Sequence, residues 1–293
     1  MRTNSNPILA GVAALCLLAI APTLATAQPA APSTCAGVTS QPLTLPGAAS
    51  FTYEAASGRD LRLHVLPTPA AGARHPAILF FFGGGWRNGS VAAFEGQARR
   101  LTDHGMVAVL ADYRVKCRDG TSPADATADA RAAYAWVRAH AAALNIDPGK
   151  IVLSGGSSGG HLAAVTAMLA PAGEKPAALV LFNPAVDLVY IAPFIGLTPA
   201  QATAISPSVL PIDQLPPTLI FHGQADHTVP IRTVRDFCAR AVAAGRPCEL
   251  HEYPSQDHGF YHNHAIDPVI GKSPYDDTLD RALAFLRALK LAD

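Results

Sequence analysis

The chain has 293 residues, with 22 lysines and arginines against 22 aspartates and glutamates, so its formal net charge is zero. Hydrophobic residues make up 49% of the sequence and charged residues 15%, which is enough apolar material for a core and excludes a chain that is disordered throughout. A neutral chain has no broad cationic field, which argues against a nucleic-acid partner.

The first 27 residues have the pattern of a secretory signal peptide. Arg2 supplies a positive charge, residues 8–21 form an uncharged apolar run, and residues 25–27 match a small-x-small cleavage site. The alternative is a membrane anchor, but the run is shorter than the roughly 20 apolar residues that a spanning helix needs. We therefore expect a secreted or periplasmic protein without stable membrane insertion after cleavage, in which residues 28–49 form a flexible tether.

Four cysteines lie beyond the predicted signal peptide: Cys35, Cys117, Cys238 and Cys248. An exported protein meets an oxidising compartment, and four thiols allow three pairings. Cys238 is expected to pair with Cys248, because a helix that stops at Gly245 and a short extended return would bring the two sulfurs level. Cys35 with Cys117 follows by elimination, and free buried thiols are the alternative.

Beyond residue 50, strand-like runs alternate with helical patterns. Residues 51–54 and 61–66 predict a hairpin that turns at residues 57–59. Six further strands are predicted at residues 77–82, 106–111, 151–153, 178–182, 218–221 and 249–253. Apolar runs separated by helices are typical of strands covered on both faces, and so predict a mostly parallel sheet.

Helices are predicted between these strands. Ser122 and Pro123 mark the start of one helix, whose apolar stripe continues to Leu144. Others are predicted at residues 162–169, 230–244 and 279–291. The proline-rich segment 188–215 is predicted to be a small cap inserted after a strand, so that residues 50–293 form one α/β domain.

The strongest chemical signal is the sequence Gly-x-Ser-x-Gly at residues 155–159. It follows a predicted strand and precedes the apolar helix at 162–169, which is the context of a nucleophile elbow. Ser157 would be the nucleophile, the flanking glycines would relieve a crowded turn, and the backbone N–H of Ser158 would face a developing oxyanion. A phosphate-binding loop is the alternative, but His161 occupies the region where a P-loop has its lysine.

Three consecutive glycines at residues 83–85 follow the strand at 77–82. Backbone amides without side chains can approach a charged oxygen closely, so Gly84 and Gly85 are the expected oxyanion donors. A simple turn is the alternative, but it needs fewer glycines. Trp86, which comes next, is interpreted as a wall of the substrate pocket rather than as a core residue.

A serine nucleophile needs an imidazole base, and the base needs a carboxylate that fixes its tautomer. Asp226 lies just beyond one predicted strand and His258 in the loop after the next, at the edge where the sites of parallel sheets gather. Asp187 is the alternative acid. The remaining nearby histidines are interpreted as structural: His161, His222 and His227.

A metal is the alternative for the histidines near the end of the chain, which are His258, His262 and His264. Histidines four and two residues apart can converge on zinc. No other ligand spacing supports this interpretation, so neither a metal nor a cofactor is expected.

With these residues the chain resembles the α/β-hydrolase superfamily, and within it the hormone-sensitive-lipase-like esterases and the related bacterial carbohydrate esterases that release acetyl or feruloyl groups. The motifs that carry the resemblance are GGSSGGHLA around Ser157, GGGW at Gly83–Trp86, Asp112-Tyr113-Arg114, His222-Gly223 with Asp226, and His258-Gly259-Phe260. They stand in family order over about residues 75–290, and the nucleophile, acid and base follow the same order as in that family.

The resemblance implies an α/β-hydrolase fold, with a mostly parallel central sheet and helices on both faces. It implies a triad of Ser157, Asp226 and His258, and an oxyanion hole formed by Gly84, Gly85 and Ser158. One departure is Phe82, where the family usually has a histidine. That histidine supports the loop rather than reacting, so hydrolysis should survive its replacement.

The sequence therefore predicts an exported serine carboxylesterase that acts on short-chain or carbohydrate-linked esters of the acetyl or feruloyl type, through an acyl-enzyme on Ser157. Its partner would be a small-molecule or polysaccharide ester. A serine peptidase of the same fold and a non-catalytic carbohydrate-binding protein on a hydrolase fold are the alternatives. The sequence carries no indication of the oligomeric state.

Overall fold

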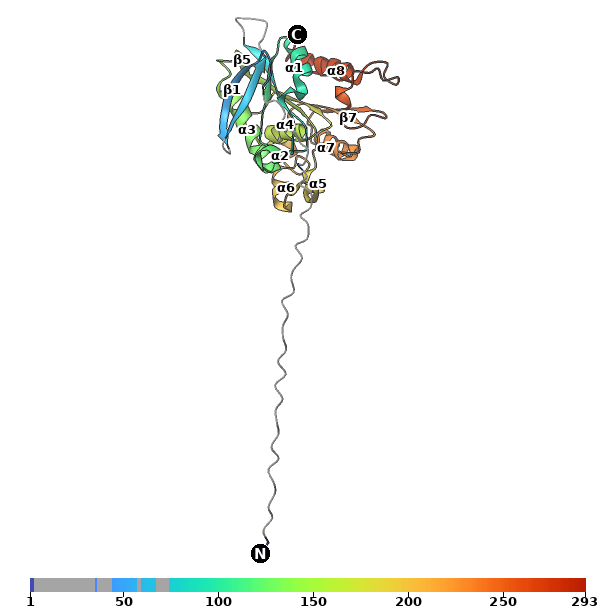
Figure 1. Cartoon of the computed structure of the whole chain (residues 1–293). Helices are drawn as coiled ribbons and strands as arrows, with labels where there is room; N and C mark the ends of the chain where they lie inside the picture. Colours follow the sequence, from blue (N-terminus) through green and yellow to red (C-terminus); the bar gives the residue numbers. More distant parts are fainter. Residues whose placement is uncertain (3–34, 36–43, 57–58, 67–73) are drawn as a thin grey trace. The chain divides into compact units, whose positions relative to one another are not determined.

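A computed structural model describes residues 1–2, 35, 44–56, 59–66 and 74–293 (Figure 1). The predicted signal peptide beyond residue 2, and most of the predicted tether, lie outside these ranges. The chain divides into two units, residues 1–36 and 37–293, and every element below belongs to the second. Within the described ranges, none of the helices combines the length and the apolar character that a membrane crossing requires.

The described strands form one sheet in the order β1-β2-β4-β3-β5-β6-β7-β8. Their bounds are β1 Ala49–Ala56, β2 Arg59–Leu66, β3 His75–Phe81, β4 Val107–Ala111, β5 Ile146–Gly156, β6 Ala178–Phe182, β7 Thr218–Gly223 and β8 Cys248–Tyr253. The β1–β2 and β2–β4 pairs are antiparallel, and all other pairs are parallel. The predicted antiparallel pairing of the first two strands and the mostly parallel sheet are confirmed, and residues 57–58 of the predicted turn lie outside the described residues.

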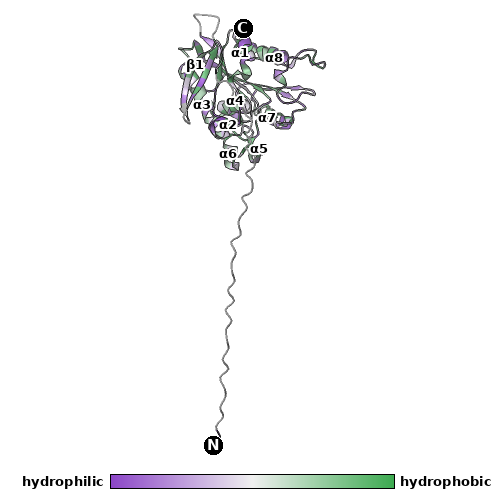
Figure 2. Cartoon of the chain, viewed as in Figure 1, coloured by the Kyte–Doolittle hydropathy of each residue, from purple (hydrophilic) through white to green (hydrophobic). Residues whose placement is uncertain are grey.

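Helices cover both faces of this sheet. Their bounds are α1 Glu95–Thr102, α2 Lys116–Asp119, α3 Pro123–Ala139, α4 Ser158–Leu169, α5 Leu188–Ile195, α6 Pro199–Ile205, α7 Ile231–Ala243 and α8 Pro274–Ala288, with 3-10 turns η1 Val91–Phe94, η2 Ile212–Gln214 and η3 Phe260–His262. Figure 1 shows α1 and α8 on one side of the sheet and α3, α4 and α7 on the other. In Figure 2, α7 and α8 carry both hydrophilic and hydrophobic residues, as helices do when one side packs on a sheet.

The start of α3 follows the sequence signal closely. The Ser122 hydroxyl accepts the Asp125 N–H, and the Asp125 carboxylate accepts the Ser122 N–H at 2.8 Å, which makes a capping box. The end differs from the prediction, because α3 stops at Ala139 and not near Leu144. Ala141 is buried although it lies beyond the helix, so the apolar stripe marked burial and not helical backbone.

Two parallel strands show why the sheet was recognisable. Every residue of β4 and β6 is buried, because helices cover both faces of the sheet. The carboxyl ends of β5, β6, β7 and β8 lie at one edge, since these strands are parallel neighbours. The residues that follow them in sequence therefore meet at that edge. The predicted cap segment holds α5 and α6, which pack on each other.

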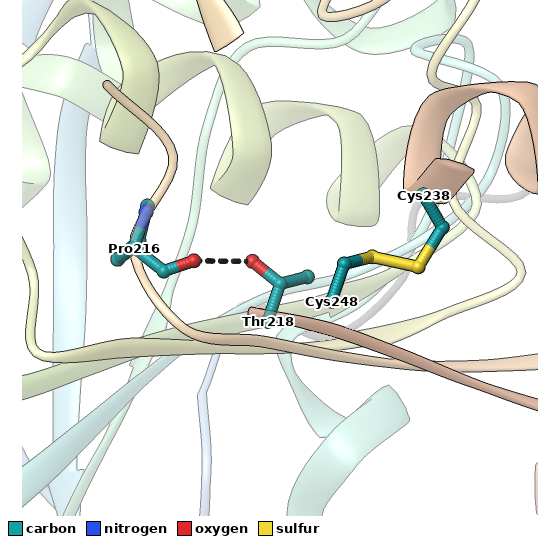
Figure 3. The surroundings of a disulfide bond; sticks show 4 residues. All are labelled: Pro216, Thr218, Cys238 and Cys248. Atoms are coloured by element: carbon teal, nitrogen blue, oxygen red, sulfur yellow. Dashed lines mark hydrogen bonds between the residues drawn. A yellow bond between two sulfur atoms is a disulfide. The ribbon is translucent and has the colours of Figure 1, made fainter. Parts of the chain in front are cut away.

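A disulfide joins Cys238 in α7 to Cys248 at the start of β8, with the two Cα atoms 5.5 Å apart (Figure 3). This is the pair that the sequence favours. Cys35 and Cys117 are also disulfide-bonded cysteines, and their pairing with each other stays a prediction.

We expect the Cys238→Ser/Cys248→Ser double variant to lose about 3 kcal/mol of unfolding free energy, since the bond closes a 10-residue loop in the unfolded chain. Urea unfolding of oxidised protein measures the loss. Val242→Ser, a substitution at an exposed position on the same helix, is the matched control. It should change the unfolding free energy by at most about 0.5 kcal/mol. A loss of the same small size in the double variant would contradict the prediction.

Candidate active site

Ser157 lies in a strained turn between β5 and α4. Its backbone has φ 55° and ψ −119°, a region that side-chain-bearing residues rarely adopt. The turn is held from both sides: the Ser157 N–H donates to the Phe182 carbonyl at 2.9 Å, and the Ser157 carbonyl accepts the N–H groups of His161 and Ala185. The hydroxyl is thus presented at the carboxyl edge of the sheet.

The glycines on either side of this turn are required by close backbone contacts. A Cβ atom on Gly155 would lie 2.5 Å from the Gly159 carbonyl carbon, and one on Gly159 would lie 2.0 Å from the Phe81 oxygen. Both distances are below any normal contact between non-bonded atoms. The pattern Gly-x-Ser-x-Gly therefore reflects a turn packed directly against β3.

Asp226 and His258 are brought together from the loops after β7 and β8. The Nδ1 atom of His258 lies 2.8 Å from Oδ2 of Asp226. The other carboxylate oxygen, Oδ1, accepts the N–H groups of Thr228 and Val229, each at 2.8 Å. Both oxygens of Asp226 are thereby oriented, and Oδ2 faces the imidazole.

The pKa of Asp226 lies below its ordinary value. Burial opposes ionisation of this carboxyl group, but the hydrogen bonds from His258 and from the Val229 and Thr228 amides favour the charged form more strongly. Asp226 is therefore an anion at neutral pH and accepts the Nδ1–H of His258. This arrangement leaves Nε2 of His258 as the basic nitrogen.

A second histidine lies behind the aspartate. His222 is fully buried, its Nε2 donates to the Val229 carbonyl at 2.9 Å, and the same nitrogen is 3.3 Å from Oδ2 of Asp226. Burial lowers the pKa of His222, so this ring is neutral. Its N–H is donated to the Val229 carbonyl, so the ring packs beside the carboxylate as a neutral group.

Ser157 and His258 approach the same edge without a direct bond. Within the described chain, the polar contacts of the His258 side chain are with Asp226 and Asn183, and no hydrogen bond joins its ring to the Ser157 hydroxyl. Catalytic hydrogen bonds are often long until a substrate is bound. Asn183 follows Phe182, whose carbonyl holds the Ser157 N–H, so one strand end connects the two groups.

The glycine run lies against the serine turn. A Cβ on Gly83 would lie 3.5 Å from Cβ of Ser157. Gly84 and Gly85 have positive φ angles of 132° and 63°, and a Cβ on Gly84 would meet the Asn88 carbonyl at 2.1 Å. In the described part of the chain, the N–H groups of Gly84, Gly85 and Ser158 donate to no protein acceptor. These amides are free to bind a negatively charged oxygen.

Phe82, the departure from the family pattern, belongs to the core. Its ring stacks on Tyr113 with centroids 4.0 Å apart, and the Tyr113 hydroxyl donates to the Phe82 carbonyl at 2.6 Å. A Cβ on Gly89 would lie 2.2 Å from the Phe82 ring, so the loop folds back over it. Aromatic packing holds the start of the glycine run in place.

Trp86 is 3% exposed and has a positive φ of 56°. Its indole meets the His161 ring edge-on, with centroids 5.2 Å apart. The backbone carbonyl of Trp86 accepts the Lys116 N–H at 2.9 Å, and the Arg87 carbonyl accepts the Cys117 N–H at the same distance. Helix α2 therefore holds the backbone of the loop that follows the glycine run.

His161 is a buried link between α4 and the cap. Its Nε2 donates to the Ile205 carbonyl in α6 at 2.8 Å, and burial lowers its pKa to about 4. The remaining alternatives have other surroundings. Asp187 is the N-cap of α5 and accepts the Tyr190 N–H, and His227 is exposed. No group of three or more potential metal ligands is present among the residues that the structure describes.

Sequence reasoning missed Asn183 and Tyr261. The Asn183 amide contacts His258, and a Cβ on Gly156 would lie 2.0 Å from the Tyr261 hydroxyl, which places that phenol beside the serine turn. The available signal for Asn183 was its position directly after a strand of the parallel sheet. Tyr261 follows His258 by three residues, but nothing in its spacing indicated the direction of its side chain.

Comparisons with known proteins agree with this geometry. A family model described as BD-FAE matches residues 63–181. The esterase LipQ of Mycobacterium tuberculosis is 29% identical over 236 residues, which cover 69% of this chain and 55% of LipQ. The acetylxylan esterase of Xylanibacter ruminicola is 27% identical over 173 residues, which cover 55% of this chain and 35% of that protein. The chain thus spans about half the length of LipQ, and less of the acetylxylan esterase.

Solved structures extend the likeness to nearly whole chains. The native esterase Est2 of the planctomycete Thermogutta terrifontis is 38% identical, with a TM-score of 0.76 over 84% of this chain and 94% of that one. Other forms of Est2 are bound to propionate or butyrate, or phosphorylated by paraoxon.

We expect His161 to make the fold less stable in acid. Its pKa falls from 6.5 to about 4 on folding, so below pH 6.5 the unfolded chain binds a proton that the folded chain does not. The unfolding free energy is therefore unaffected by this group above pH 6.5 and decreases as the pH falls to about 4. The loss by pH 4 is about 3 kcal/mol. His161→Gln keeps a donor for the Ile205 carbonyl but cannot titrate.

Urea unfolding at pH 7.5 and pH 4 tests this expectation. The fall in unfolding free energy between the two pH values should be smaller in His161→Gln by about 3 kcal/mol. The lowered pKa of other groups, including Asp226 and His222, affects both proteins equally. An identical fall in variant and wild type would show that His161 does not titrate with folding.

Proposed function

Because the chain belongs to the α/β-hydrolase superfamily, among the hormone-sensitive-lipase-like esterases, we propose that it hydrolyses carboxylic esters through an acyl-enzyme on Ser157. The observation that carries the proposal is the pairing of Asp226 with His258 at 2.8 Å, at the same sheet edge as the strained serine turn. A nucleophile, an oriented base and unpaired amides are the parts that acyl transfer needs.

In this mechanism, the Ser157 hydroxyl attacks the ester carbonyl while Nε2 of His258 removes its proton. The ionised Asp226 accepts the Nδ1–H and stabilises the imidazolium that forms. The N–H groups of Gly84, Gly85 and Ser158 bind the oxyanion of the tetrahedral intermediate, where preorganised donors lower the barrier. His258 then gives its proton to the leaving alcohol, and water activated by the same base releases the acid.

The substrate we propose is an ester with a short acyl group, with acetylated carbohydrate as the natural target. The propionate and butyrate complexes of Est2 support a short acyl group, and the acetylxylan esterase supports a carbohydrate alcohol. We also propose that the protein is exported, which agrees with its disulfide-bonded cysteines. An extracellular polymer would then be within its reach.

Ser157→Ala should lower the kcat for p-nitrophenyl acetate by about 10³-fold or more, because no other group forms the acyl-enzyme. A fluorophosphonate probe should label wild type and leave this variant unlabelled. Ser154→Ala is the matched control: it removes a buried hydroxyl of β5 that bonds to the Val180 carbonyl, and should keep both turnover and labelling.

Three results would contradict the proposal. Turnover or labelling that survives in Ser157→Ala would exclude this nucleophile. Wild type that is neither labelled nor active would indicate a non-catalytic binding protein on a hydrolase fold. Faster cleavage of amides than of esters would indicate a peptidase.

A panel of acetyl, butyryl, octanoyl and feruloyl esters tests the acyl group. We expect kcat/KM for acetyl and butyryl esters to exceed that for octanoyl esters by about tenfold or more, because a pocket shaped for a short acyl group has no room for further methylenes, and a misfit of even one methylene is worth a factor of this order. Acetylated xylo-oligosaccharides in the same assay test the alcohol. A preference for octanoyl esters would overturn the short-acyl assignment and leave the nucleophile untouched.

A further inference from the structure

We propose that Asn183 is a positioning residue for His258, and that its amide holds the plane of the imidazole ring. The inference rests on the proposed function, since it assigns the ring a task during ester hydrolysis. Among the described residues no hydrogen bond joins Asn183 to Ser157 or to the oxyanion donors, so it would act through the histidine.

The two contacts of Asn183 define where its amide lies. Its Nδ2 atom is 3.2 Å from Nδ1 of His258 and also 3.2 Å from Nε2. The two ring nitrogens flank the same carbon, so an atom in the ring plane at equal distance from both would collide with that carbon. The amide nitrogen therefore lies against the face of the ring, and not in the ring plane in line with a nitrogen lone pair.

The backbone of Asn183 is held in place. It is fully buried, its backbone N–H donates to the Phe221 carbonyl of β7 at 2.7 Å, and its φ is 34°. Asparagine tolerates this left-handed region better than most residues. Strained backbone of this kind persists where the surroundings enforce it, and it gathers at functional sites.

His258 has few other contacts that could fix the orientation of its ring. Its side chain is 22% exposed and keeps one strong side-chain hydrogen bond, from Nδ1 to Asp226. A single bond fixes one atom of the ring but not the orientation of its plane. Contact with the Asn183 amide restricts the tilt of the ring plane. Nε2 then points in one direction while Nδ1 stays hydrogen-bonded to Asp226.

Two carboxylates already lie near His258, whereas Asn183 is neutral. Asp226 faces Nδ1, the Asp257 carboxylate accepts the His258 backbone N–H at 2.6 Å, and the neutral His222 lies behind Asp226. A carboxylate at position 183 would be a third anion near the ring. It would favour the imidazolium and raise the pKa of the base.

Three variants separate the roles of the amide. Asn183→Asp keeps shape and backbone tolerance but adds charge. Asn183→Leu keeps volume and removes the polar amide. Asn183→Gly relieves the strained φ and removes the ring contact. Asn145, which also has a positive φ (56°) but precedes β5 at the opposite edge of the sheet, provides the control Asn145→Asp.

We expect the acid limb of the kcat/KM profile for p-nitrophenyl acetate to move up by about one pH unit in Asn183→Asp and to stay in place in Asn145→Asp. In Asn183→Leu and Asn183→Gly, kcat should fall by about tenfold or more while KM changes less than about threefold, because orientation of the base matters in the transition state.

Histidine NMR titration makes the test independent of turnover. The His258 signals, identified by their absence in His258→Gln, should titrate at higher pH in Asn183→Asp than in wild type. An unchanged titration would overturn the inference, as would an unaltered kcat in both Asn183→Leu and Asn183→Gly with only a lower melting temperature. If Ser157→Ala failed to abolish hydrolysis, the proposed function would be rejected instead. The contact between Asn183 and the His258 ring would then be tested by the NMR titration alone.

Discussion

The structure depends on one constraint, the passage of the chain from β5 into α4 through a residue with a positive φ. Ser157 can hold this conformation because three other parts of the molecule bond to it or touch it: the end of β6, the first turn of α4 and the glycine run after β3. The glycines beside this turn are needed because a Cβ on Gly155 or Gly159 would collide with neighbouring backbone. The glycines are thus consequences of the turn, and the turn determines where the hydroxyl lies.

The acid and base are organised by a different principle, the satisfaction of a buried carboxylate. Asp226 receives two backbone amides on one oxygen and the His258 ring on the other. This set of donors offsets the cost of burying the charge and keeps the group ionised. The carboxylate is therefore fixed before any substrate arrives, which is the condition for orienting His258.

Much of this arrangement could be predicted from the sequence, since it depends on short-range patterns. The apolar runs gave the parallel strands, and the capping signal at Ser122 gave the start of α3. The end of α3 could not be predicted, because the periodicity of Ala141 and Leu144 reports burial, which a turn can also provide. Helix α1 was missed because it is only eight residues long and polar on most of its surface.

The candidate site shows the same division. Ser157, Asp226 and His258 stand in motifs with local signals, so their neighbourhood at one edge followed from the order of parallel strands. The stacking of Phe82 on Tyr113 and the contact of Asn183 with His258 join residues 31 and 75 positions apart. Such contacts depend on how neighbouring strands are staggered, which no local pattern encodes.

The bond from His161 to the Ile205 carbonyl has a consequence for the position of α6. Its other ring nitrogen, Nδ1, has no partner among the described atoms, so losing this bond would leave a buried imidazole wholly unsatisfied, at a cost of about 1–3 kcal/mol. The bond therefore opposes separation of α6 from α4, the helix that begins directly after Ser157. Helix α6 is in this way tied to the same helix that positions the nucleophile.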